Sequence, residues 1–357
     1  MAPAAQDTAP HGVPATLGFR MPAEWEPHAA TWLAWPHKKD SWPGNFGPIP
    51  AVWVEMVRAL EPHERVNILV NDAGAAANVR QLLRTAAVSD RNVSLHVIPT
   101  NDAWVRDHGP TFITRRRGPQ TELAAVKWRY NAWGGKYPPW DLDDEVAEKV
   151  AAQVGVPVVR PGIILEGGSI DVNGNGTLLT TEACLLNPNR NPQLNRAQIE
   201  QYLHDYLGAR HILWLGEGIA GDDTDGHIDD LARFVDPSTV VTVLETNPQD
   251  DNFEPLQANY ERLRGMTDQD GRTLRIVTLP MPRPVLYNDQ RLPASYANFY
   301  IANGVVLVPT FNDPNDATAL RALKALFPQR HVVGIHATEM VWGLGAMHCV
   351  TQQQPAA

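Results

Sequence analysis

The segment LEGGSIDVNGNGTLLTTEACLLNPNRNP, residues 165–192, holds a pattern that two different folds could produce. From Asp171 to Glu182 it matches the calcium-binding loop of an EF-hand, with oxygen-bearing side chains at the required spacing and a closing glutamate. An EF-hand also needs a helix on each side, but glycines precede this loop and its second half, TLLTT, is typical of a strand. Because repeated Asn-Gly pairs favour a tight turn between strands, we predict a β-hairpin here.

Apolar runs typical of strands, TLLTT among them, are distributed along the chain. They are VNILV (66–70), LHVIP (95–99), TLLTT (177–181), VVTVL (240–244) and VVLVP (305–309). Patterns typical of helices lie between them: AVWVEMVRAL (51–60), DDEVAEKVAAQV (143–154), RAQIEQYLHDYLG (196–208) and DATALRALKALF (316–327). This alternation predicts an α/β architecture. The similarity of the five strand units indicates an internal repeat, although their spacing is irregular.

Composition restricts the classes of partner. The 357 residues carry a formal net charge of −10, and the longest basic run is Arg115–Arg117, so a nucleic-acid partner is disfavoured and a small cationic ligand is favoured. No apolar run reaches the length of a membrane span, so we expect no membrane partner. Eleven tryptophans are more than a core usually needs, and we expect some of them to line a pocket.

The N-terminus and the cysteines predict the organisation and location of the chain. Residues 1–17 are rich in alanine and proline and lack the basic start and apolar block of a secretory signal. We therefore expect a disordered tail over residues 1–17 and a single domain over residues 18–357. Two cysteines, Cys184 and Cys349, cannot form a disulfide framework, which favours a reducing, cytoplasmic setting.

Cys349 is the better candidate for a reactive thiol. It follows the glycine-containing segment WGLGAMH, whose backbone could approach a reacting atom closely. The adjacent His348 is not automatically its base, because neighbouring side chains on an extended segment point to opposite faces. The alternative is that Cys349 is a small buried hydrophobe. Cys184 lies among apolar residues, and we expect it to pack in the core.

The acidic segment GDDTDGHIDD, residues 221–230, contains a candidate general acid/base. His227 and Asp229 are two residues apart and would face the same side of an extended strand. A histidine beside carboxylates holds its proton more strongly, which suits acid/base chemistry. A solvated acidic turn and a metal site are the alternatives. Calcium fits the spacing badly, and zinc would need more histidine or cysteine ligands than this segment supplies.

Two further segments carry residues that could act in a site. NDAWVRDHGP, residues 101–110, combines Trp104 and Asp107 directly after a predicted strand, and LEGGS places Glu166 before two glycines. Each of these residues alone is also compatible with a structural role, as a core aromatic, an ion pair or a turn residue.

Taken together, segments from nearly the whole chain resemble the agmatine deiminase family of the guanidine-modifying (pentein) superfamily. They are MPAEWEPHAATWLAWP (21–36), NDAWVRDHGPTF (101–112), residues 165–192, DDTDGHIDDLARFV (222–235), SYANFYIANGVVLVPTFNDPNDA (295–317) and HCVTQQQP (348–355). The resemblance implies an α/β fold, a five-bladed propeller of ββαβ repeats with pseudo-five-fold symmetry. It also implies a central polar site that uses no metal and no other cofactor. Peptidylarginine deiminases belong to the same superfamily.

The resemblance also implies an activity and roles for single residues. The expected reaction is hydrolysis of agmatine to N-carbamoylputrescine and ammonia, a step of putrescine biosynthesis, by a protein that could be a homodimer. The nucleophile falls on Cys349 and the general acid/base on His227. Asp107 and Asp229 match the carboxylates that hold the guanidinium, Glu166 matches an active-site glutamate, and Trp104 matches the aromatic wall.

Two departures from the family pattern leave the substrate open. The family's GGGN before the cysteine segment is Gly343-Leu344-Gly345-Ala346 here. The glutamate that would meet the substrate amine is Asp223, which is one methylene shorter, and Asp222 could compensate. The alternatives are therefore a deiminase of another alkylguanidine or of peptidylarginine. From a different class, a non-catalytic calcium- or ligand-binding propeller stays open.

The chemistry of the guanidinium supports the same residue types independently. It is planar and cationic, so two carboxylates can grip it through paired N–H groups. Resonance makes its central carbon a poor electrophile, which calls for a strong, well-positioned nucleophile such as a thiolate. The bound cation can itself promote ionisation of the thiol.

Overall fold

The computed structural model describes residues 12–357, and within them five sheets share one strand order. Four sheets join an antiparallel pair to a third, parallel strand. They are β4 (Thr111–Arg117), β5 (Gln120–Val126) and β6 (Val158–Val159); β7 (Asp171–Val172), β8 (Thr177–Thr181) and β9 (His211–Leu215); β10 (Ala232–Asp236), β11 (Thr239–Leu244) and β12 (Arg275–Pro280); and β15 (Tyr300–Ile301), β16 (Val305–Thr310) and β17 (His331–His336). A small hairpin of β13 (Leu286–Tyr287) and β14 (Gln290–Arg291) stands apart from them.

The first sheet takes one strand from the other end of the chain. Its order is β18 (Thr351–Pro355), β1 (His28–Ala34), β2 (Arg65–Val70) and β3 (Val93–Val97). β18 lies antiparallel to β1, with His28 opposite Pro355 and Leu33 opposite Thr351, and β1 continues in parallel to β2. This sheet therefore has the same antiparallel–parallel order as the other four, with β3 as an additional strand.

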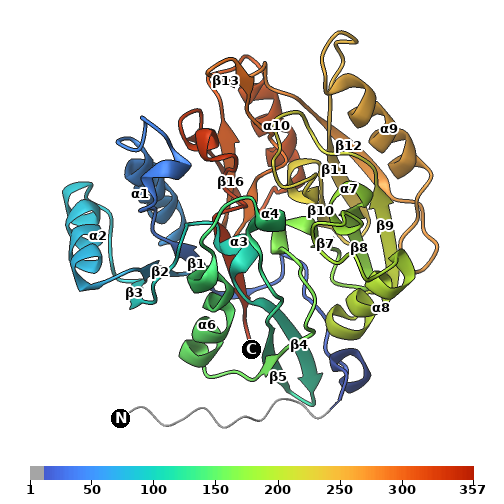
Figure 1. Ribbon diagram of the computed structural model, residues 1–357, viewed down its shortest axis with the longest axis horizontal. Coiled ribbons are helices and arrows are strands. Elements are labelled where there is room, and N and C mark those ends of the chain that lie inside the picture. The colour runs from blue at the N-terminus through green and yellow to red at the C-terminus, as the bar shows by residue number, and fades with distance from the viewer. Residues whose placement is uncertain (1–11) are drawn as a thin grey trace.

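A helix crosses over between the two parallel strands of each unit. These helices are α1 (Ile49–Leu60), α6 (Val146–Val154), α8 (Arg196–Leu207), α9 (Phe253–Arg264) and α10 (Asp316–Leu326), and α2 (Ala73–Thr85) leads into β3. Figure 1 shows them around the outside of the molecule, whereas the short helices α3 (Val105–His108) and α4 (Ala132–Gly135) lie near its centre. The remaining short helices are α5 (Asp141–Asp144) and α7 (Glu182–Leu185). The prediction of a pentein-type α/β fold with five ββαβ units is confirmed.

Helix α1 illustrates why the crossover helices form where they do. Trp53, Met56, Val57 and Leu60 are fully buried, so the apolar residues of α1 recur every three to four positions on one face. That face packs against the sheets, and the opposite face is exposed. The helices predicted over 51–60, 143–154, 196–208 and 316–327 are all present, and the first part of 143–154 belongs to the separate helix α5.

The five predicted strands are present, but they do not correspond one to each unit. TLLTT, VVTVL and VVLVP are the central strands β8, β11 and β16 of three sheets, whereas VNILV and LHVIP are β2 and β3 of the first sheet. The sheet of β4, β5 and β6 contains none of them. Strand β4 ends in Arg115–Arg117, whose charged residues project partly into solvent and hide the strand pattern.

Residues 171–182 form the predicted hairpin. β7 and β8 pair antiparallel, with Asp171 opposite Leu179. In the connecting turn, the Asn173 side-chain oxygen accepts hydrogen bonds from the backbone N–H groups of Asn175 and Thr177. The Asp171 carboxylate accepts from Phe234 N–H at 2.7 Å, so the oxygens that suggested a calcium loop serve the hairpin and its neighbours instead.

Part of the segment predicted to be a disordered tail is ordered. Residues 1–11 lie outside the described part of the chain, but Pro14–Leu17 form a 3₁₀-helix, η1, where we expected disorder. Pro14 is buried, and a proline at the first position is preorganised for a helical turn. Leu17 packs against the apolar cluster that contains Phe19. The single domain over residues 18–357 stays a prediction. From residue 12 onwards, no helix combines the length and the apolar character needed to cross a bilayer.

Candidate active site

A cavity of about 450 Å³ contains four of the residues that the sequence singled out. Cys349, Asp107, Trp104 and Asp223 all lie in its wall. The other lining residues are Lys38, Asp40, Ser41, Pro43, Asp102, Trp133, Lys136, Tyr137, Pro138, Thr224, Tyr287, Gln290, Leu292, Trp342, Gly343 and Leu344. The volume suits a small molecule. Three tryptophans line the cavity, which confirms the expectation drawn from composition.

Cys349 lies just before β18, and its Sγ has two polar neighbours. Asn298 Nδ2 donates a hydrogen bond to Sγ at 3.0 Å, and Sγ lies 3.6 Å from Asp229 Oδ2. Burial, followed by the negative charges of Asp229, Asp230 and Asp107, raises the pKa of the thiol well above its ordinary value. The thiol therefore stays protonated at neutral pH until a cation in the cavity lowers that pKa.

Asp107 belongs to α3, and both of its oxygens are held. Oδ1 accepts a hydrogen bond from Gly168 N–H and Oδ2 accepts one from Trp133 Nε1, both at 2.9 Å. Burial raises the pKa of this carboxyl, and Asp229 adds to the rise, although His227 opposes it. The carboxylate is thus fixed in direction at the cavity wall, where a cation would lower its pKa again.

His227 lies against Asp107 and is completely buried. Its Nδ1 is 3.7 Å from Asp107 Oδ1, and neither ring nitrogen has a hydrogen-bond partner among residues 12–357. Burial alone would lower its pKa, but Asp107, the Cys184 thiol and Asp229 together raise the pKa of His227 well above its ordinary value. The ring therefore carries a proton at neutral pH and has free N–H groups to donate it.

Gly168 makes this arrangement possible. A Cβ atom at this position would lie 2.6 Å from His227 Nδ1, 2.8 Å from Asp107 Oδ1 and 3.0 Å from Asp229 Oδ2. Any larger residue would push these three side chains out of place. The LEGGS segment thus contributes close backbone approach as well as Glu166.

Glu166 and Cys184 lie beside His227. One ligand atom from each of these three residues lies within 4.8 Å of the others. Glu166 Oε1 accepts a hydrogen bond from Arg190 Nε at 2.8 Å, and Oε2 has no partner in the described part of the chain. Cys184 is fully buried in an apolar cluster, as predicted. Its thiol also helps to raise the pKa of His227, so it does more than pack in the core.

The same trio is the only group in residues 12–357 with the spacing to hold a metal ion. The Arg190 guanidinium already occupies Glu166, and it places a positive charge next to any cation bound there. A structural zinc site would also need a fourth ligand. These residues fit a metal poorly, and the absence of a metal stays a prediction.

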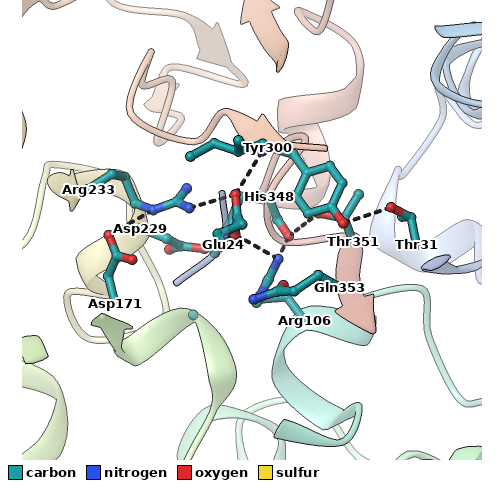
Figure 2. A network of polar contacts seen from close by, with 12 residues as sticks. Glu24, Thr31, Arg106, Asp171, Asp229, Arg233, Tyr300, His348, Thr351 and Gln353 are labelled. Atoms are coloured by element: carbon teal, nitrogen blue, oxygen red, sulfur yellow. Dashed lines mark hydrogen bonds and ion pairs between the residues drawn. The ribbon is translucent and has the colours of Figure 1, made fainter. Parts of the chain in front are cut away.

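Asp229 connects the cavity to a buried polar network. Its Oδ2 contacts His348 Nδ1 at 2.7 Å, and His348 Nε2 contacts Glu24 Oε2 at 2.8 Å (Figure 2). Burial would raise the pKa of Asp229, but the hydrogen bond and the charge of His348 outweigh it and lower the pKa. Asp229 therefore stays ionised, and its second oxygen, Oδ1, has no partner within residues 12–357.

Glu24 is the centre of this network, which we call the central network. Arg233 Nη2 lies 2.9 Å and Arg106 Nη2 3.3 Å from its carboxylate, and Ile301 N–H donates to Oε1 at 2.8 Å. Despite burial, Arg233, His348 and Arg106 lower the pKa of Glu24 well below its ordinary value. Other members are Asp171, Tyr300, Thr31, Thr351 and Gln353, so β1, β7, β10, β15 and β18 all reach this network (Figure 2).

Asp223 and Asp222 lie in different surroundings. Asp223 lines the cavity, and its carboxylate is bound by Lys136 and by the Tyr137 hydroxyl. Asp222, which we expected near the substrate, is not part of the lining. Its two oxygens accept hydrogen bonds from Thr224 N–H at 2.7 Å and Gly226 N–H at 2.9 Å, so it shapes the loop before His227.

Sequence reasoning missed several residues of the site. Asn298 donates to the Cys349 sulfur and accepts from His348 N–H at 2.9 Å, and Trp133 orients Asp107. His348 was considered only as a base for its neighbour, whereas its ring points to Asp229 and Glu24. No local pattern marks these residues. The only available signal for Asn298 and His348 was that they lie in segments that resemble the family, and Trp133 lies outside those segments.

Comparisons with known proteins point to one family. The family model described as Porphyromonas-type peptidyl-arginine deiminase matches residues 20–355. A relative from Ectopseudomonas mendocina named agmatine deiminase is 40% identical, over 96% of this chain and 97% of its own. The solved agmatine deiminase of Enterococcus faecalis has a TM-score of 0.90 and 36% identity, covering 98% of this chain and 99% of that one. An agmatine deiminase from C. jejuni, solved with substrate bound, has a TM-score of 0.85 and 32% identity, covering 94% of this chain and 96% of its own.

Proposed function

The chain belongs to the Porphyromonas-type peptidyl-arginine deiminase family, and we propose that it hydrolyses agmatine to N-carbamoylputrescine and ammonia. The family is one of hydrolases that act on the carbon–nitrogen bonds of amidines. One observation carries the proposal. A buried thiol, Cys349, lies in one small cavity with the carboxylate of Asp107, and it is 3.6 Å from the carboxylate of Asp229.

Substrate binding is assigned to the two carboxylates and an aromatic wall. Asp107 and Asp229 would accept hydrogen bonds from the guanidinium N–H groups, which are arranged in pairs and carry the positive charge. Support comes from the unpaired Oδ1 of Asp229 and from the fixed direction of Asp107. Trp104 lies in the same wall, where its ring can cover the flat guanidinium.

The first half of the reaction forms a covalent intermediate. The bound cation lowers the pKa of Cys349, the thiol releases its proton to solvent water as the cation binds, and the thiolate attacks the central carbon of the guanidinium. His227 donates its proton to one amino group, the carbon–nitrogen bond breaks, and ammonia departs. The product is a thiouronium cation on the Cys349 sulfur. The raised pKa of His227 supports its role as the acid.

The second half regenerates the enzyme. The now neutral His227 takes a proton from water, and the hydroxide adds to the thiouronium carbon. The carbon–sulfur bond then breaks, the thiolate leaves, and the product is a urea derivative after loss of one proton. Glu166 would act on His227 as a positioning residue, held in turn by Arg190 at 2.8 Å. Asn298, which donates to the sulfur, would stabilise the thiolate.

A second candidate is a deiminase of another alkylguanidine or of peptidylarginine. The observation that favours it is the occupied carboxylate of Asp223, which does not stand free for a substrate amine. The calcium- or ligand-binding alternative depended on the acidic clusters, and in residues 221–230 Lys136 pairs with Asp223 and Arg190 pairs with Asp225. Asp222 stays a proposal only as a residue that supports the loop of Asp223.

Ammonia release against a panel of guanidines tests the proposal. Agmatine, arginine, a blocked peptidylarginine and simple alkylguanidines are each incubated with the protein, and ammonia and the urea product are measured. Agmatine should give the highest kcat/KM, with equal amounts of ammonia and N-carbamoylputrescine. No ammonia from any guanidine would contradict the deiminase chemistry. A better rate with peptidylarginine would favour the second candidate.

The cellular setting follows from the same assignment. Cytoplasmic location, a small cationic guanidine as the partner, no nucleic-acid partner and a homodimer belong to the proposal. Two free cysteines and the net charge of −10 support the location and the partner class. Cell fractionation and light scattering of the purified protein test the location and the oligomeric state.

A further inference from the structure

Lys136, which directly follows α4, lies at the wall of the cavity over the loop of Asp223 and Asp225. Its Nζ is 3.2 Å from Asp223 Oδ1, 2.9 Å from Asp225 Oδ1 and 2.6 Å from the Asp223 backbone oxygen. A lysine ammonium has three N–H donors, and all three have a partner here. Burial would lower the pKa of Lys136, but the bonds to Asp225 and Asp223 raise it, so the ammonium keeps its charge.

The chain's own groups therefore occupy the acid that the family resemblance assigned to the substrate amine. Lys136 binds Oδ1 of Asp223 and the Tyr137 hydroxyl binds Oδ2. Lys136, Tyr137 and Asp223 all line the cavity that contains Cys349. The ammonium of a substrate tail that enters this region meets the carboxylate of Asp223, which is already paired with Lys136.

Asp225 and Asp223 differ in whether they have a charged partner other than Lys136. Asp225 has further partners, because Arg190 pairs with it and Asn189 Nδ2 donates to it at 2.9 Å. Asp223 has Lys136 as its single ion-pair partner among residues 12–357. If Lys136 moves away, Asp225 stays paired and Asp223 becomes available. The Lys136 side chain is 28% exposed, so it can move into solvent without opening the core.

We propose that Lys136 sets the preference of the cavity for the charge at the far end of a guanidine, by holding Asp223. This inference rests on the proposed function. A tail ammonium must displace Lys136 to bind Asp223, whereas an uncharged tail leaves the pair intact. A tail carboxylate gains Lys136 as a partner. Lys136 thus narrows the advantage that agmatine would otherwise have over neutral and acidic guanidines.

Three guanidines of matched length test this inference: agmatine, pentylguanidine and 5-guanidinopentanoate, whose tails end in an ammonium, a methyl group and a carboxylate. Their kcat/KM values are measured for wild type, Lys136→Met and Lys136→Arg. Lys149→Met is the matched control, because Lys149 pairs with Glu145 on the surface and lies outside the cavity lining.

The expected effects are changes in ratios. In Lys136→Met, the ratio of agmatine to pentylguanidine should rise about two- to fivefold, the range for a partly exposed ion pair. The ratio of 5-guanidinopentanoate to pentylguanidine should fall by a similar factor. Lys136→Arg keeps the charge, and it and Lys149→Met should keep the wild-type ratios. Thermal melting of each variant, with Lys136→Gln as a second neutral replacement, checks that the fold is intact.

The measurements distinguish failure of this inference from failure of the proposed function. Unchanged ratios in both neutral variants, or equal losses for all three guanidines, would overturn the role of Lys136 while leaving the deiminase activity in place. If wild-type protein hydrolyses none of the three, the proposed function fails and this inference fails with it.

Discussion

Two buried polar regions meet at Asp229, and they differ in how completely their atoms are paired. In the central network, the carboxylate of Glu24 contacts two guanidinium groups, an imidazole and a backbone N–H. On the cavity side, both ring nitrogens of His227, Oε2 of Glu166 and Oδ1 of Asp229 have no partner among residues 12–357. An unpaired buried polar atom costs about 1–3 kcal/mol of stability. A bound ligand can supply missing partners on the cavity side, although His108, Asn252 and Thr338 carry unpaired buried atoms elsewhere in residues 12–357.

The pKa shifts of Glu24 and of the cavity groups show the same difference, although burial raises the pKa of Asp171 in the central network to about 6. In the central network the pKa of Glu24 is lowered, because positive charges surround it, so its charge is fixed. On the cavity side the pKa values of Cys349, His227 and Asp107 are all raised, so each of these groups holds a proton more strongly than in water. Groups with a fixed charge stabilise a structure. Groups whose pKa a bound cation can lower are suited to proton transfer.

Replacing the Cys349 thiol should lower activity without lowering stability, which distinguishes the cavity side from the central network most clearly. Cys349→Ser should lower kcat for agmatine at least about 10³-fold, because a neutral hydroxyl cannot replace the thiolate as nucleophile. Its free energy of unfolding, measured in urea, should stay close to that of wild type because the central network is intact. Turnover near the wild-type rate would contradict a covalent mechanism.

Replacing Glu24 in the central network should instead lower the stability of the fold. Glu24→Gln leaves Arg106 buried without its counter-charge and leaves Arg233 with Asp171 alone, and it should lower the free energy of unfolding by about 3–5 kcal/mol. Glu261→Gln is the matched control, since its pair with Arg264 is exposed and should contribute less than about 1 kcal/mol. Equal stability of the two variants in urea would show that the central network is not a stabilising element.

The pH dependence of stability gives a second view of the same carboxylate. The folded-state pKa of Glu24 is depressed, so its stabilising contribution is fully present above its unfolded value near 4.5 and is lost as the pH falls through the folded pKa. Wild type should therefore lose stability faster than Glu24→Gln below about pH 4.5. Parallel pH curves for the two proteins in urea unfolding would contradict this linkage.

His227 should affect the rate much more than the stability. His227→Asn should lower kcat by about 10²-fold, the lower end of the range for a general acid. Because the imidazole has only its ion pair with Asp107 and no hydrogen bond within residues 12–357, its loss should lower the melting temperature by only a few degrees. A large drop in melting temperature would place His227 with the structural groups instead.

The smallest effect concerns the ionisation of Cys349. A neighbouring carboxylate raises the pKa of a thiol, so Asp229→Asn should lower it and speed alkylation of Cys349 by iodoacetamide at pH 8 by about three- to tenfold. Cys184→Ser provides the background in which only Cys349 can react. Asp223→Asn is the control, because Asp223 is not among the causes of the shift. Slower alkylation in Asp229→Asn would contradict the sign of the effect.

The sequence predicted the parts of the molecule that have a local signature. Amphipathic helices such as α1 and apolar strands such as β11 were found because each element is long and has one environment along its length. The cavity residues Cys349, Asp107 and Trp104 were found through segment resemblance, and the structure brings them together with Asp223. Asp222 does not line the cavity whereas Asp223 does, and adjacent aspartates in one loop cannot be separated by spacing alone.

The central network could not be predicted in this way. Glu24, Arg233 and His348 are far apart in sequence, and a single charged residue in a strand or loop looks like a solvated one. β18 reads as the polar segment TQQQP, yet Thr351, Gln352 and Gln353 are buried. Their polarity makes sense only after the central network is known, since burial of polar groups depends on partners from other segments.

The pairing of β18 with β1 has a consequence for the synthesis of the chain. Trp32 Nε1 donates to Gln354 Oε1 across a separation of 322 residues, so β1 leaves the ribosome long before its neighbour exists. Contacts between residues so far apart in sequence raise the contact order of a fold and slow its folding. Cys349 lies immediately before β18, so its thiol is also synthesised long after β1. A nascent chain therefore lacks the proposed nucleophile until this segment is made, and an unpaired β1 edge is exposed to chaperones or to neighbouring chains during that interval.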